Sequence, residues 1–266
     1  RHMAKPTIAN VAELAGVSQA TVSRALRGAT NVTEETRIKV QRAADQLNFT
    51  LSKSASALAS GKTMRVILLV SGKLNEWFNS GVLQGVYEEL APVGYDITPA
   101  FITDRSELDR FFSQLPKSRN ADAIIISSFQ LMPAMRDQLQ AIDLPTVGVN
   151  VPTESGYFDA SVSIDNSSAM TMAVRLLRSL GHTNIAFCSD YIPADMVYNT
   201  SQRTQAFADA AQANATDGIT FSLLTADAHD APLSKSDLAS QLTAKLLSLP
   251  ERPTAVCVET DQVAIA

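Results

Sequence analysis

The chain has 266 residues, 45% of them hydrophobic and 18% charged, which is long enough for two or three domains with sizeable cores. It contains no apolar run of membrane-spanning length, no signal peptide and no low-complexity tract, which excludes a membrane protein and predicts a soluble globular one. Cys188 and Cys257 lie far apart in strand-like apolar runs, so two reduced thiols are expected rather than a disulfide or a metal pair.

Charge is divided unevenly along the chain. Residues 1–62 hold nine basic and four acidic side chains, a net charge of +5, although the whole chain carries −5. The remaining residues hold 13 basic and 23 acidic side chains, a net charge of −10. A basic N-terminal module on an acidic body is typical of a protein whose head meets phosphate, and a merely solvated surface would not explain the segregation.

A helix, a glycine-containing turn and a second helix are predicted near the N-terminus. Thr7 is a suitable N-cap, and apolar residues recur at helical spacing over residues 8–15. Gly16 ends this helix, because glycine adopts the left-handed conformation without steric cost. Ser18 caps a second short helix whose apolar side chains face inward. This succession is the helix-turn-helix motif.

The outward face of the second helix is polar and suits the major groove of DNA. The Gln19 amide pairs well with adenine, and the Arg24 guanidinium fits guanine. The hydroxyls of Thr21 and Ser23 are suited to phosphate oxygens. From these residues alone, the alternative is an ordinary helical hairpin with a polar outer face.

The run TIANVAELAGVSQATVSRAL at residues 7–26 resembles the N-terminus of the lactose-repressor (LacI/GalR) family of bacterial transcription regulators. Residues 32–40, in which Thr33 caps a third helix, match that family as well. The resemblance implies that Gln19, Ala20 and Arg24 read bases, while Thr7, Thr21 and Ser23 hold the DNA backbone. The expected DNA-binding residues of the head are Thr7, Ser18, Gln19, Ala20, Thr21, Ser23, Arg24 and Arg27.

Residues 51–62 are predicted to join the head to the body. In isolation this Ser/Ala-rich stretch is typical of a flexible linker. The resemblance implies a hinge helix, disordered without DNA, in which Ala55 and Leu58 contact DNA and Leu58 wedges into the minor groove. Leu51, Ser56 and Ala59 replace the family's proline and basic residues, so weaker phosphate binding with a flatter salt dependence is expected.

From residue 64 onward, strands alternate with helices, which predicts parallel doubly wound sheets with right-handed crossovers. Strands are expected at residues 66–70, 95–101, 123–127, 146–149, 162–164, 184–188, 219–224 and 255–258. Helices are expected at residues 80–91, 106–115, 132–142, 167–180, 202–213, 236–248 and from 262 onward.

The segment LRSLGHTNIAF at residues 177–187 extends the resemblance along nearly the whole chain. It implies an all-α helix-turn-helix head at residues 4–50, the hinge at 51–62, and an α/β body similar to periplasmic binding proteins. The two lobes of that body are expected at residues 63–164 and 165–266, with a ligand cleft between them. Members of the family run well past residue 266, so the chain is expected to be incomplete at its C-terminus.

Effector-binding candidates follow the predicted strands, because ligands of open α/β sheets bind beyond the carboxyl ends of strands. Trp77 can stack on a sugar ring or a base, although packing between the lobes is an equal alternative. Arg203 and Asp261 match family motifs and either bind vicinal hydroxyls of a sugar or pair with each other at the surface. The expected effector-binding residues are Asn75, Trp77, Phe78, Ser127, Asn150, Asp165, Arg203 and Asp261.

The sequence contains no nucleophile elbow, Walker loop, dinucleotide fingerprint or metal-ligand spacing, so catalysis, cofactors and metals are not expected. We therefore predict a cytoplasmic, nucleoid-associated repressor of carbohydrate or related metabolic genes. Its expected partners are double-stranded operator DNA, a small effector such as a sugar, and a second copy in a homodimer, since one recognition helix covers only a half-site. The alternative is a solute-binding or sensor protein of the periplasmic-binding type.

Overall fold

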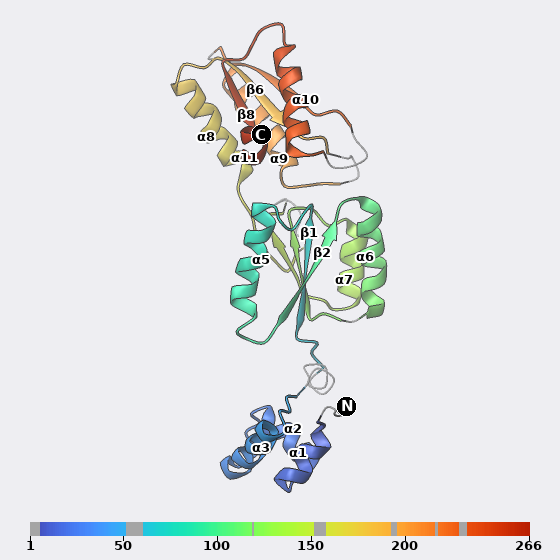
Figure 1. Ribbon diagram of the computed structural model, residues 1–266. Helices are drawn as coiled ribbons and strands as arrows, with labels where there is room; N and C mark the ends of the chain where they lie inside the picture. Colours follow the sequence, from blue (N-terminus) through green and yellow to red (C-terminus); the bar gives the residue numbers. More distant parts are fainter. Residues whose placement is uncertain are drawn as a thin grey trace. The chain divides into compact units, whose positions relative to one another are not determined.

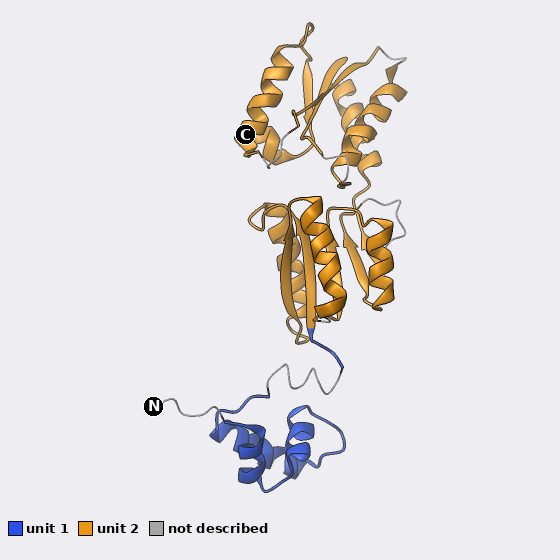
Figure 2. Ribbon diagram, turned by 90° about the vertical axis from the view of Figure 1, so that its right-hand side faces the viewer, with its two compact units in different colours: residues 1–64 blue, residues 65–266 orange. Residues whose placement is uncertain are grey.

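A computed structural model describes residues 6–51, 61–118, 120–151, 158–192, 196–215, 218–228 and 233–266. The chain folds into two compact units, Arg1–Met64 and Arg65–Ala266 (Figure 2). The first is helical and the second alternates strands with helices, which confirms the predicted fold class. The predicted hinge contacts Ala55 and Leu58 lie outside the described residues.

The head consists of α1 (Ile8–Ala15), α2 (Gln19–Leu26) and α3 (Glu34–Gln46). Each helix begins after a predicted hydroxyl cap, and these caps, Thr7, Ser18 and Thr33, all accept a backbone N–H from the first turn. Gly16 ends α1 with φ of 67°, in the left-handed region. The three helices bury a small shared core built around Val11, Val22 and Val40, which is what holds so short a unit together.

The first lobe of the larger unit is a parallel sheet in the order β2-β1-β3-β4-β5. Its helices cover both faces, α5 on one side and α6 with α7 on the other (Figure 1). The strands are β1 (Arg65–Ser71), β2 (Asp96–Ile102), β3 (Ala123–Ser127), β4 (Thr146–Val149) and β5 (Ala160–Val162). The helices are α5 (Trp77–Leu90), α6 (Arg105–Ser118) and α7 (Pro133–Ala141).

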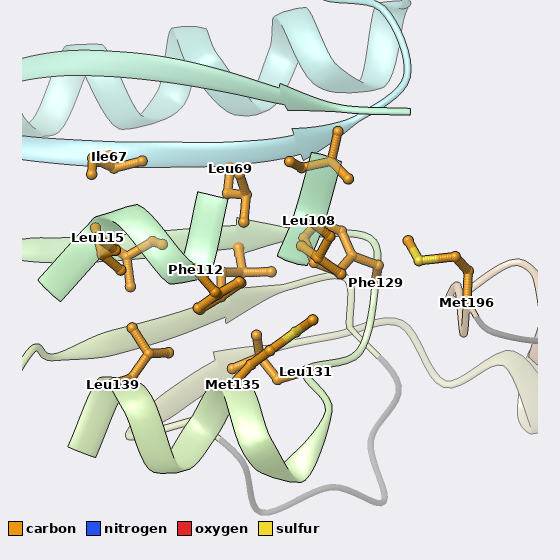
Figure 3. Close-up of a cluster of buried hydrophobic side chains, with 13 residues drawn as sticks. Ile67, Leu69, Leu108, Phe112, Leu115, Phe129, Leu131, Met135, Leu139 and Met196 are labelled. Carbon is orange, nitrogen blue, oxygen red and sulfur yellow. The ribbon is translucent and has the colours of Figure 1, made fainter. Parts of the chain in front are cut away.

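The core of this lobe lies between the sheet and the pair α6 and α7 (Figure 3). Ile67 and Leu69 of β1 face Phe112 of α6, and Met135 and Leu139 of α7 complete the cluster. Residues 66–70 of β1 are all buried, as expected for a central strand with helices on both faces. The helices on both faces of the sheet leave the strand ends and the loops that follow them at the edge of the lobe.

The second lobe holds a parallel sheet in the order β7-β6-β8 among the described residues. Its elements are α8 (Asn166–Ser179), β6 (Asn184–Ser189), α9 (Ser201–Ala213), β7 (Thr220–Thr225), α10 (Lys235–Leu247), β8 (Ala255–Val258) and α11 (Asp261–Ile265). Phe187 of β6 packs with α8 and α9, whereas its neighbour Cys188 packs with α10 and α11. Successive side chains of β6 therefore point to opposite faces of the sheet, as expected from the two-residue period of a strand.

Several predicted boundaries differ from the structure, and two of these differences have a clear physical reason. Helix α5 begins at Trp77 rather than at residue 80, because the buried Asn79 amide donates to the carbonyl oxygens of Ser71 and Lys73 and ties the first turn to the end of β1. Strand β5 ends at Val162 rather than beginning there, since its register pairs Ala160 with Val147 of β4. Both shifts come from contacts between elements rather than from local sequence.

Candidate functional site

The head presents the predicted reading face of α2. Val22 and Ala25 are buried against the other two helices, while Gln19, Ala20 and Arg24 are exposed. The Arg24 Nε–H donates 3.2 Å to the Ala20 carbonyl oxygen of its own helix. The three residues predicted to contact bases therefore lie on the solvent-accessible side of α2, while the opposite side of the helix packs against α1 and α3.

The predicted backbone contacts of the head are arranged around the helix starts. Ser18 Oγ accepts the Thr21 backbone N–H at 3.1 Å and lies 2.9 Å from the Thr21 hydroxyl. Thr7 forms a reciprocal capping box with Asn10, whose Oδ1 accepts the Thr7 N–H at 2.9 Å. Arg27 is exposed just past the end of α2, and Ser23 is half-buried. Helix N-termini and hydroxyls of this kind suit phosphate oxygens.

The body contains a cavity of about 780 Å³ that the two lobes line together. Its walls come from segments that follow the carboxyl ends of β1, β2, β3 and β4 in the first lobe. From the second lobe come the segments after β6 and β8 and the starts of α9 and α10. This is the place where open α/β sheets hold ligands, and the volume suits a small molecule.

Five residues of the predicted effector set line this cavity: Trp77, Phe78, Asn150, Arg203 and Asp261. Trp77 is 61% exposed and meets Phe78 edge to face at 5.7 Å, so it is not packed into a core between the lobes. Its exposed indole can stack on a ligand. Asp261 is exposed at the first position of α11, where the helix dipole stabilises its negative charge.

The other three predicted residues, Asn75, Ser127 and Asp165, lie outside the described lining of the cavity. Ser127 is fully buried at the end of β3, and it is the next residue, Ser128, with φ of 74°, that faces the cavity. Asp165 caps α8, accepting the Ser168 backbone N–H at 2.9 Å, and this hydrogen bond lowers the pKa of the carboxyl group. Asn75 is exposed in the turn before α5.

A chain of buried amides joins the two lobes beside the cavity. Asn199 Nδ2 donates 2.6 Å to Asn150 Oδ1 after β4, and Asn199 Oδ1 accepts from the Asn166 amide at the start of α8. Asn166 Oδ1 in turn accepts the Arg203 Nε–H at 3.1 Å. Asn150, Asn166 and Asn199 are all at least nine-tenths buried. We call these three residues the asparagine relay; a buried polar network of this kind holds its members in one arrangement.

Arg203 closes the relay rather than pairing with Asp261. Its Nη1 donates 2.5 Å to the backbone carbonyl oxygen of Glu259, at the end of β8. Within the part of the chain that the structure describes, no ion pair joins Arg203 to Asp261, so the predicted alternative of a surface pair is wrong. The guanidinium is thus oriented toward the cavity by both of its hydrogen bonds.

Glu259 is one of the cavity residues that are absent from the predicted effector set. It is 8% exposed, and its Oε2 atom is buried without a hydrogen-bond partner among the described residues. Burial raises the pKa of this carboxyl group to about 7, against the opposing effect of a hydrogen bond from the Asp190 backbone. Its position directly after the strand at residues 255–258 was the available signal. Asn166 and Asn199 follow no such rule, because the contact between their side chains forms only when the start of α8 meets the segment before α9.

The two cysteines are free thiols, as predicted. Cys188 is buried and Cys257 half-buried, and burial raises the pKa of both thiols. In the described ranges, no three potential His, Cys, Asp or Glu ligands gather in a group that could hold a metal ion. No helix among those same ranges is long and apolar enough to cross a lipid bilayer.

Two family models match the chain, one over the head and one over the C-terminal part of the body. The model of bacterial regulatory proteins, lacI family, matches residues 7–52, and that of the periplasmic binding protein-like domain matches residues 174–266. The HTH-type transcriptional repressor PurR of Vibrio cholerae serotype O1 (strain M66-2) is 30% identical over 262 residues, which cover 97% of this chain and 74% of that protein.

Two solved structures share the fold. A lac repressor dimer bound to operator and the anti-inducer ONPF superimposes with a TM-score of 0.79 at 21% identity, covering 98% of this chain and 76% of that one. A complex of the transcriptional regulator CelR with cellobiose gives a TM-score of 0.56 at 25% identity, covering 97% and 75%.

Proposed function

Because the chain belongs to the lacI family of bacterial regulatory proteins, it is a DNA-binding transcriptional regulator, and we propose that it represses metabolic genes until a small effector occupies the cavity. The observation that carries the proposal is the pairing of an exposed reading face on α2 with a two-lobed ligand cavity in one chain. The alternative prediction of a solute-binding protein is wrong, because the relatives of this chain are transcriptional regulators and its head matches the lacI family.

The DNA target of the proposal is a pseudo-palindromic operator bound by a homodimer in the bacterial cytoplasm. One short recognition helix spans only a half-site, so two copies are needed for a full one. Gln19 and Arg24 read bases, while Ser18, Thr21 and Ser23 hold phosphates with Thr7 and Arg27. The hinge residues Ala55 and Leu58 complete the set in the minor groove.

The effector of the proposal is a small polyhydroxylated molecule such as a sugar. An exposed Trp77 beside Phe78 offers a flat apolar surface for a sugar ring, while Arg203, Asn150 and Asp261 offer hydrogen bonds to hydroxyls. A relative of the same fold, CelR, has been solved with cellobiose. Effector binding changes the angle between the lobes and, in the dimer, the spacing of the two hinge segments, which is a coupling between two sites.

Operator binding tests the DNA half of this proposal. A preferred duplex is selected from a random pool, and its affinity is measured by fluorescence anisotropy. Arg24→Ala is expected to cost about 1–3 kcal/mol and to relax base preference at one position of each half-site. Arg42→Ala, which removes an exposed arginine of α3, is the matched control and should leave base preference unchanged. Equal loss of preference in both variants would place the reading face elsewhere.

Thermal unfolding with candidate ligands tests the effector half. Mono- and disaccharides, nucleosides and sugar phosphates are screened for a rise in melting temperature, since a ligand of the native state stabilises it by mass action. The ligand found should lose its effect in Arg203→Ala and should release the operator from the wild-type protein. A ligand that stabilises both proteins equally would bind outside the cavity.

A further inference from the structure

Beyond hydroxyl recognition, we propose that the effector carries an amino group and that Glu259 is the carboxylate that binds it, so that an amino sugar is the ligand class of this cavity. The inference rests on the proposed function, because it assigns a group of the effector to one residue of the effector site. The inference starts from Glu259, whose main-chain atoms are held by hydrogen bonds while its Oε2 atom has no partner among the described residues.

The backbone of Glu259 is held at both ends of the residue. Its N–H donates to the Cys188 carbonyl oxygen at 2.9 Å, and its own carbonyl oxygen accepts from Arg203 at 2.5 Å. Glu259 is only 8% exposed and lies in the cavity wall. Its Oε2 atom has no hydrogen-bond partner among the described residues. A buried carboxylate oxygen without a donor is costly, and a ligand that brings a donor removes that cost.

The charged groups around Glu259 do not neutralise it. Asp190, after β6, carries a like charge, although its backbone donates a hydrogen bond. Arg203, on α9, already donates to Asn166 and to the Glu259 main chain. Lys235, at the start of α10, is exposed to solvent, which screens its charge. Burial therefore prevails and raises the pKa of Glu259 to about 7.

The rest of the cavity favours a cation as well. Acidic side chains outnumber basic ones in the described lining. The acidic ones are Glu76, Asp104, Asp190, Glu259 and Asp261, and the basic ones are Arg105, Arg203 and Lys235. This balance disfavours phosphorylated ligands. Trp77 adds an exposed aromatic face, which attracts both an ammonium group and the apolar face of a sugar. An aminated sugar satisfies the aromatic face and the unpaired carboxylate together.

The experiment compares amino sugars with their parent sugars by calorimetry. D-glucosamine and D-galactosamine are titrated beside D-glucose and D-galactose into the full chain. At least one amino sugar is expected to bind tenfold or more tightly than its parent. Glu259→Gln, which keeps the shape of the side chain, should abolish this preference. Glu251→Gln, an exposed control outside the described cavity lining, should keep it.

A second measurement follows amino-sugar affinity as a function of pH. The amine prefers the ionised carboxylate, so amino-sugar affinity should rise about fivefold between pH 6 and pH 7 for a group with a pKa of about 7. In Glu259→Gln the rise should vanish, and a cooperative melting curve shows that this variant is folded.

Failure of both amino sugars to bind more tightly than their parent sugars, or an unchanged preference in folded Glu259→Gln, overturns the inference. Operator binding by the same samples separates this from failure of the proposed function. If a neutral sugar and neither amino sugar releases the operator, the proposed function stands and the inference of an amino group is refuted. If the protein binds no operator at all, the proposed function and the inference are both refuted.

Discussion

Glu259 sets a pH dependence of stability at the scale of a single residue. Its pKa in the folded protein is about 7, above the value of 4.5 for an unperturbed carboxyl group. Between these values the folded state binds more protons, so the contribution of Glu259 to stability is fully present below pH 4.5 and is lost as pH rises through 7. The neutral Glu259→Gln should therefore gain stability over the wild type from pH 5 to pH 8, by up to about 3 kcal/mol.

Urea unfolding of both proteins at the two pH values measures this difference. Glu251→Gln, in which an exposed carboxylate is replaced, is the control and should show no comparable gain. A difference between Glu259→Gln and wild type that stays constant with pH would mean that Glu259 is ionised in the folded protein throughout.

At the scale of elements, Gly148 lets β4 pack against the segment that follows it. A Cβ built at Gly148 would lie 2.6 Å from Val151 Cγ2 and 3.0 Å from the Phe158 ring. Gly148→Ala is therefore expected to destabilise the body by about 1–3 kcal/mol through overpacking. Chemical denaturation of the full chain checks this, and wild-type stability in the variant would show that the Val151 side chain moves aside freely.

Gly85 of α5 is the matched glycine in the same lobe. It is exposed within the helix, and a Cβ there would meet nothing within 4 Å. Gly85→Ala should stabilise the body by about 0.5–1 kcal/mol, because alanine loses less conformational entropy in a helix. The two substitutions add the same methyl group and should move the urea midpoint in opposite directions.

At the scale of the whole molecule, the asparagine relay links the lobes that share the cavity. Asn199 is 1% exposed and bonds both Asn150 and Asn166. Asn199→Ala leaves two buried amides short of a partner, at about 1–3 kcal/mol each. We expect lower stability and a smaller effect of the effector on operator affinity, read from anisotropy titrations with and without ligand. Full coupling in a destabilised variant would show that the relay only supports the fold.

The uneven charge of the chain governs how salt affects its two ligands. The basic head meets phosphate while the acidic body meets a small molecule, so only the first equilibrium releases many counterions. Operator affinity should fall about 10³-fold between about 50 and 200 mM salt. Effector affinity, measured by calorimetry over the same range, should change far less. Similar salt dependence for both ligands would contradict the assignment of DNA to the head.

Local sequence was sufficient where one segment's own chemistry decides its structure. The caps Thr7, Ser18 and Thr33 and the stop at Gly16 specify the head, because each acts within one turn of its helix. The alternation of buried runs with amphipathic segments specified nearly every strand and helix of the body. The rule that ligands bind beyond strand ends found Trp77, and a family motif found Arg203, without any coordinates.

Tertiary structure decided which of these strand-end residues face the cavity. Ser127 is buried, whereas Ser128, with φ of 74° in the left-handed region, lines the cavity, so a shift of one residue reverses the answer. Asn199 reached its two partners only through the packing of segments 33 and 49 residues away along the chain. The sequence by itself thus determined the elements and the family. The unpaired carboxylate of Glu259 and the relay came from long-range packing, because burial and hydrogen-bond partners belong to the assembled lobes.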